Sequence, residues 1–172
     1  AERNLRRSIA LCHEIEDERH EAIGHQNLGR LRTYQGLFEE AEAELGLAHS
    51  LFERHNDQQA EGIVWAYRVL RALLMNTPDA ALEAARRAHA LADVNHNERD
   101  IIRAEWLIGA ALVAQAEGVE HARSSLAEAE VHLTTALTRC RKINLIELEP
   151  DILLAWAKWH RRSGNAAQAR AD

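Results

Sequence analysis

The chain repeats itself at an interval of 40 residues. Residues 8–11 read SIAL, residues 48–51 read AHSL and residues 88–91 read AHAL. A fixed period of this size is typical of helical repeat arrays, in which each unit buries its apolar face against its neighbours. The composition agrees, because 31 alanines against two prolines and eight glycines favour long helices that pack closely. We therefore expect an all-α fold.

The clearest unit covers residues 20–56 and contains two helix patterns that meet at a glycine. Small or apolar side chains at Ala41, Leu45, Ala48 and Phe52 follow steps of three and four residues, which form one stripe of an α-helix. Gly36 precedes this stripe, and glycine tolerates the positive φ with which many helices end. The pattern predicts an antiparallel helix pair with its turn at Gly36.

This unit resembles the tetratricopeptide repeat. Leu28 and Gly29 stand in its first helix, Gly36 and Phe38 stand at its turn, and Ala41 opens the stripe of its second helix. The period of 40 residues exceeds the usual 34, so the chain is similar to the long-helix variety of multidomain bacterial signalling regulators. The resemblance implies a right-handed α-solenoid of antiparallel helix pairs, with about eight or nine helices.

The period divides the chain into one array of approximate units. The units are residues 1–19 (a second helix only), 20–56, 57–96, 97–146 and 147–172 (truncated). Between Gly109 and Ala129 the repeat shifts by eight residues, so we expect an insertion near 117–123. Thr77 and Pro78 predict the start of a second helix. Because both ends cut through a unit, we expect the chain to be a fragment of a longer protein.

Charge and hydropathy narrow the classes of partner. The chain has 21 basic and 27 acidic residues, for a net charge of −6, and lacks a basic run that could follow a phosphate backbone. We therefore expect no nucleic-acid partner. No apolar stretch reaches the roughly 20 residues of a membrane span, and no signal peptide opens the sequence. These features predict a soluble, cytoplasmic protein that does not bind membranes.

The sequence contains no motif for catalysis or for a cofactor. Two histidines that bind a metal from one helix usually stand three or four residues apart, and none of the ten histidines has such a neighbour. Cys12 and Cys140 lack a CxxC spacing and are expected to be reduced thiols that pack between helices. We therefore expect no metal, no cofactor and no enzymatic activity.

The candidate binding surface is the concave side that the resemblance implies, where first helices present residues to ligands. Carried over by repeat position, the candidate residues are Gln26, Asn27, Arg30, Tyr34, Tyr67, Leu70, Arg103, Trp106, Lys158, Arg161 and Arg162. This set predicts an apolar floor with basic residues at both ends. Such a surface suits a protein or peptide with apolar anchors and flanking acids.

Other interpretations stay open at this point. Leu70, Leu73, Trp106 and Val113 could be closed core instead of an open groove. The floor around Tyr67 could also receive a small-molecule effector or a signalling peptide. Exposed end helices could allow self-association. The leading hypothesis is a non-enzymatic interaction scaffold, the sensor or interaction segment of a larger regulatory protein.

Overall fold

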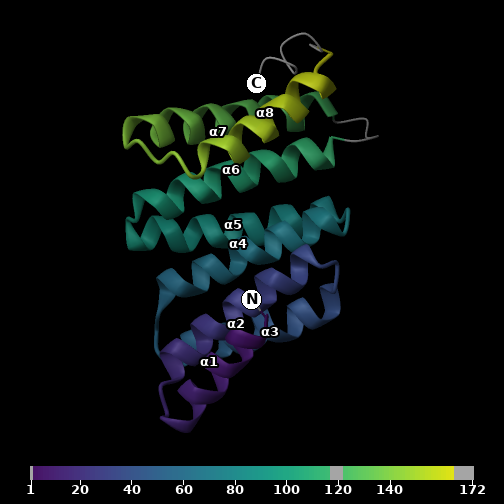
Figure 1. Ribbon diagram of the computed structural model, residues 1–172. Coiled ribbons are helices and arrows are strands. Elements are labelled where there is room, and N and C mark those ends of the chain that lie inside the picture. Colours follow the sequence, from purple (N-terminus) through teal and green to yellow (C-terminus); the bar gives the residue numbers. More distant parts are fainter. Residues whose placement is uncertain (1, 117–121, 165–172) are drawn as a thin grey trace.

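The computed structural model describes residues 2–116 and 122–164, and these residues form helices without a strand. The helices are α1 (Glu2–Glu14), α2 (Glu18–Tyr34), α3 (Phe38–Arg54), α4 (Gln58–Leu74), α5 (Pro78–Asn95), α6 (Glu98–Gln115), α7 (Ala122–Lys142) and α8 (Glu149–Arg162). Figure 1 shows them stacked from α1 at one end to α7 and α8 at the other. The prediction of an all-α fold is confirmed.

The helices pack in chain order and in layers. Each helix contacts the next along the chain, and α2, α4, α6 and α8 also contact one another in succession. Within the described part of the chain, the odd-numbered helices make no such contacts among themselves. The even-numbered helices therefore form one continuous layer. The right-handed superhelical path stays a prediction.

The described turns between helices share a residue with positive φ, at a constant spacing on either side of the insertion. Residues with positive φ recur every 20 positions, and after the insertion the series continues; the residues are Glu16, Gly36, Asn56, Asn76, His96, Asn144 and Gly164. At the Gly36 turn, the Leu37 amide donates to the Arg32 carbonyl across 3.0 Å, which closes the last turn of α2. The predicted turn at Gly36 is confirmed, and α5 begins at Pro78 as predicted.

The first helix of each unit also starts in the same way. The N-cap residues of α2, α4 and α6 are Asp17, Asp57 and Asn97, which stand 40 residues apart. Each side chain accepts a hydrogen bond from the backbone amide three residues later, as N-cap carboxylates and amides commonly do. Because the caps and turns recur at the same repeat positions, equivalent residues of successive units occupy equivalent places in their helices.

Within each helix pair, bulk on one helix faces a small residue on the other. A Cβ on Gly29 would lie 2.7 Å from Cγ of Leu45, and a Cβ on Gly109 would lie 2.7 Å from Cγ of Leu133. The α4–α5 pair reverses this arrangement, because Val69 stands at the glycine position and Ala85 at the leucine position. Both are fully buried in one cluster. The larger residue on α4 is thus compensated by the smaller residue on α5.

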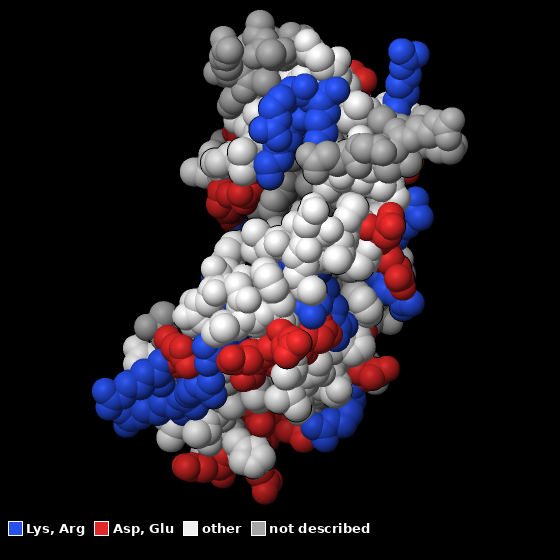
Figure 2. All heavy atoms as spheres, turned by 90° about the vertical axis from the view of Figure 1, so that its right-hand side faces the viewer, with Lys and Arg blue, Asp and Glu red and all other residues white. Residues whose placement is uncertain are grey.

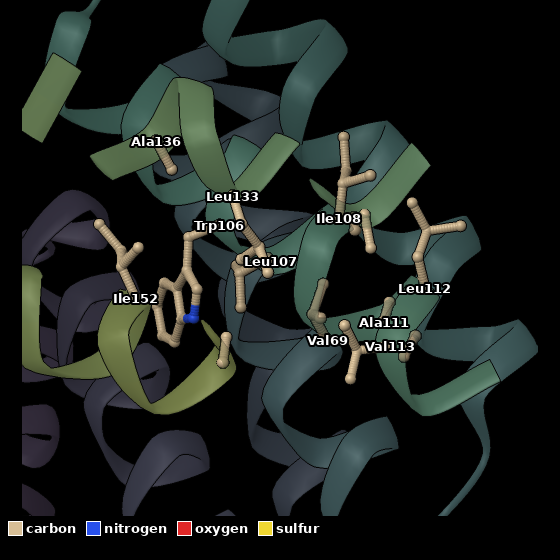
Figure 3. Packing of buried hydrophobic residues seen from close by; sticks show 14 of the residues in the cluster. Val69, Trp106, Leu107, Ile108, Ala111, Leu112, Val113, Leu133, Ala136 and Ile152 are labelled. Atoms are coloured by element: carbon tan, nitrogen blue, oxygen red, sulfur yellow. The ribbon is translucent and has the colours of Figure 1, made fainter. Parts of the chain in front are cut away.

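The larger core cluster extends from α4 to α8. Figure 3 shows Trp106 beside Ile152 and Leu107 beside Leu133, so α6 packs against both α7 and α8. Cys140 is buried in this cluster; burial raises the pKa of its thiol, as expected of a packing cysteine. At the other end of the stack, α1 has no buried residue. Self-association through the exposed end helices stays a prediction.

The insertion lies partly in α7. Ala129 is the eighth residue of α7, whereas the equivalent Ala81 is the fourth residue of α5, so one added helical turn precedes Ala129. The other inserted positions fall at 117–121, outside the described residues.

Pro150 stands in the first turn of α8, where its missing amide hydrogen costs no helical bond. The truncated second helix predicted after Gly164 also lies outside the described residues.

No helix within residues 2–116 and 122–164 combines the length and apolar character needed to cross a membrane. This finding concerns the described helices alone.

We expect Gly29→Ala to lower the free energy of unfolding. The new methyl group would overlap buried Leu45, and overpacking costs about 1–3 kcal/mol, more than the roughly 1 kcal/mol gained in helix propensity. Gly46→Ala is the control, because no atom lies within 4 Å of a Cβ there, and it should raise the stability. Urea denaturation measures both. Equal changes in the two variants would contradict close packing at Gly29.

Candidate functional site

Six of the eleven candidate residues meet in one pocket between α2, α4, α6 and α8. The pocket is lined by Tyr34, Leu70, Leu73, Leu74, Asn76, Trp106, Ala110, Val113, Ala114, Asp151, Leu154, Ala155, Lys158, Arg161 and Arg162. We call it the four-helix pocket. Its volume of about 440 Å³ lies within the range of known ligand sites, which is roughly 300–1,000 Å³.

The repeat builds this pocket by bringing equivalent positions of four helices together. The even-numbered helices run in the same direction, so their last two turns lie along one edge of the stack (Figure 1). One position contributes Tyr34, Leu74, Ala114 and Arg162; a second contributes Leu70, Ala110 and Lys158; a third contributes Leu73, Val113 and Arg161. The eight-residue insertion is absorbed before α8, which therefore supplies the same positions.

The floor of the four-helix pocket is part core and part open surface. Trp106 is 9% exposed and Val113 is 1% exposed, so both belong to the core. Leu70 and Leu73 are half-buried and pack against that core from the pocket side. At the rim, Tyr34 is 65% exposed. Apolar side chains gathered at an open surface are typical of binding sites.

One wall of the pocket is basic, and α8 carries it. Trp159 and Arg162 help to hold α8 in place: the Trp159 indole donates to the Leu126 carbonyl of α7 across 2.7 Å, and Arg162 donates to the Val113 carbonyl of α6. Lys158 and Arg161 are exposed, and neither forms an ion pair with any residue that the structure describes. Figure 2 shows basic side chains gathered high on this face above a broad uncharged area.

Sequence reasoning missed the one acidic residue of the pocket. Asp151 is exposed in the first turn of α8, three residues before Leu154 and seven before Lys158, so the three share one helix face. Arg30, the basic residue expected at the other end of the floor, lies outside the lining of this pocket. The spacing of Asp151, Leu154 and Lys158 in the sequence indicates a shared helix face. The candidate residues, however, came only from the last turns of the first helices. Asn76, in the α4–α5 turn, was missed for the same reason.

The other five candidates lie outside the pocket lining. Three serve helix packing or local bonding: the Gln26 amide donates to the Ala60 carbonyl across 3.3 Å, the Asn27 amide donates to the Ile23 carbonyl across 2.9 Å, and Arg103 pairs with Asp100 at 2.8 Å.

Arg30 and Tyr67 contact each other. The Arg30 guanidinium lies 5.6 Å from the centre of the Tyr67 ring, an ordinary cation–π separation. Its Nη1 also lies 3.5 Å from the Tyr67 hydroxyl oxygen. The pair therefore links α2 and α4 within the layer of even-numbered helices, separate from the basic wall on α8.

Several histidines join neighbouring helices through carboxylates. Glu105 of α6 contacts His89 of α5 at 3.2 Å and His132 of α7 at 2.6 Å. The equivalent positions in α2 and α3 hold His25 and Glu44, whose contact at 2.6 Å has the two residue types exchanged. Within the described residues, no group of three or more histidine, cysteine or acidic side chains is arranged to hold a metal. These histidines have an evident packing role.

The Glu105 carboxylate is expected to make the stability of the stack depend on pH. Burial, the largest influence, raises its pKa, but hydrogen bonds and charge interactions with His132 and His89 together lower the pKa below its ordinary value of 4.5. A lowered pKa means that the stabilisation is present above pH 4.5 and is lost as the pH falls through the folded-state pKa.

We therefore expect Glu105→Gln to be less stable than the wild type at neutral pH, with a difference that shrinks below pH 4.5. Urea denaturation across this pH range measures it. Glu53→Gln is the control, because Glu53 is exposed and forms no ion pair with the described residues. A difference for Glu105→Gln that stays constant down to pH 3 would contradict the role given to the carboxylate.

Comparison with protein-family models finds no match, and no curated protein matches the chain. A functional assignment therefore depends on the chemistry of the four-helix pocket, since a fold by itself does not determine a function.

Proposed function

We propose that this chain is a non-enzymatic segment that binds a protein or peptide in the four-helix pocket. The observation that carries the proposal is an apolar floor, open at Leu70 and Leu73, next to two cations that lack ion-pair partners among the described residues. Apolar anchors supply most of the binding free energy in peptide recognition, and charges at the rim add specificity.

The chemistry of the pocket supports a partner with apolar and acidic side chains. Tyr34, Leu74 and Leu154 are each more than half exposed at the rim, and together with the floor they offer aromatic and aliphatic contacts. Lys158 and Arg161 favour a carboxylate beside the apolar anchor. The resemblance to the tetratricopeptide repeat supports the same set of helices as the ligand-binding side. The long period further supports a place in a larger regulatory protein, as its sensor or interaction segment.

A receptor for a small molecule is the second candidate. The volume of about 440 Å³ suits a small ligand. The hydroxyl of Tyr34 and the side chains of Asn76 and Asp151 provide polar groups around the apolar floor. Thermal-shift screening separates the two candidates: stabilisation by a metabolite favours the receptor, whereas stabilisation by peptides alone favours the interaction segment.

The charge-reversed variant Lys158→Glu/Arg161→Glu tests the proposal. We expect the wild-type chain to enrich binders from a display library of random 12-residue peptides. The variant should bind those peptides at least tenfold more weakly, because attraction to acidic residues becomes repulsion. Fluorescence anisotropy measures the affinities. Arg162 is left unchanged because its bond to the Val113 carbonyl holds α8.

The matched control is Arg3→Glu/Arg7→Glu on α1. Both arginines are exposed, they form no ion pair with the described residues, and their reversal changes the net charge by the same amount. This control should keep the wild-type affinity. Unchanged binding by Lys158→Glu/Arg161→Glu, or equal losses in both variants, would rule out the four-helix pocket as the site.

A further inference from the structure

The four-helix pocket carries opposite charges at the two ends of α8. Asp151 lies in the first turn, and Lys158 and Arg161 lie in the last two turns. All three are exposed and line the pocket, and Asp151, like the two cations, forms no ion pair with the described residues. Among the described residues, the pocket lining is therefore bipolar, with one anion near the start of α8 and two cations near its end.

The distance between these charges determines how long a bound peptide segment must be to reach both ends of the pocket. An α-helix rises 1.5 Å per residue, so Asp151 lies roughly 10 Å from Lys158 and roughly 15 Å from Arg161 along the axis. An extended peptide advances about 3.3 Å per residue, so the same span corresponds to about three to five residues. A short extended segment can reach both ends of the pocket at once.

The surface between the charged ends is apolar. On α8, Leu154 and Ala155 lie between Asp151 and Lys158. Across the pocket, Leu70 and Trp106 face the same space from α4 and α6. A ligand that spans the charges must therefore present at least one apolar side chain between its own charged groups, because a polar side chain would lose its hydration there.

We propose that the pocket selects an extended peptide segment with a basic group at Asp151, an apolar side chain over the floor, and an acidic group at Lys158 and Arg161. The basic and acidic groups stand three to five residues apart. This inference rests on the proposed function and narrows it, because a segment with acids at both ends would place a carboxylate against Asp151.

Peptides selected by the wild-type chain from the random 12-residue library test this inference. We expect enriched sequences to contain a lysine or arginine three to five positions from an aspartate or glutamate, with an apolar residue between them. Asp151→Lys should weaken binding of such a peptide roughly three- to tenfold, since an attraction becomes a repulsion at an exposed site. Asp151→Asn should weaken it less, and it retains a side chain suited to the first turn of α8.

The control is Glu53→Lys, which makes the same charge change on α3, away from the pocket, and should leave the affinity within twofold of wild type. Circular dichroism confirms that each variant keeps its helices. Enriched peptides that bind the pocket without a basic residue, or that bind Asp151→Lys as well as wild type, would overturn the bipolar inference alone. Failure of the wild type to enrich any peptide would overturn the proposed function as well.

Discussion

Close approach of the two helices in each pair is the constraint on which the rest of the structure depends. Gly29 and Gly109 have no room for a Cβ, because Leu45 and Leu133 fill that space. In the α4–α5 pair, Val69 and Ala85 occupy these positions. The larger residue is now on the first helix and the smaller one on the second, so the pair fills a similar volume. Interiors at this density tolerate volume-conserving exchanges far better than single changes in size.

Equal pairs and equal turns then place the binding chemistry. A residue with positive φ follows the described helices at intervals of 20 positions. After the insertion the same interval separates Asn144 from Gly164. The last turns of α2, α4, α6 and α8 consequently meet at one edge, where Tyr34, Leu74, Ala114 and Arg162 are equivalent. Had α8 been displaced by the insertion, its cations would not face the apolar floor.

Much of the fold could be predicted from the sequence, because its signals are local. Gly36 and Pro78 mark turns and helix starts through their own backbone preferences. The left-handed turn at His96 carries a weaker local signal, since the residue is neither glycine nor asparagine. The equivalence of repeat positions also brought six candidate residues into one pocket.

The remainder of the site depends on partners that are distant in the sequence. Gln26 faces the neighbouring helix as expected of a groove residue, but its amide reaches the Ala60 carbonyl, 34 positions away, and becomes part of the packing. The partner of His132 is Glu105, 27 positions earlier. No local pattern specifies such contacts, because they arise when helices pack.

The claim that each helix pair depends on close packing of a large residue against a small one is tested most directly by a double-mutant cycle at Val69 and Ala85. Ala85→Leu should overpack against Val69, and Val69→Gly should leave a gap; each is expected to cost about 1–3 kcal/mol in the free energy of unfolding measured in urea. The double variant recreates the pairing of Gly29 with Leu45, so it should recover more than about 1 kcal/mol relative to the sum of the single changes. Strictly additive losses would contradict the account.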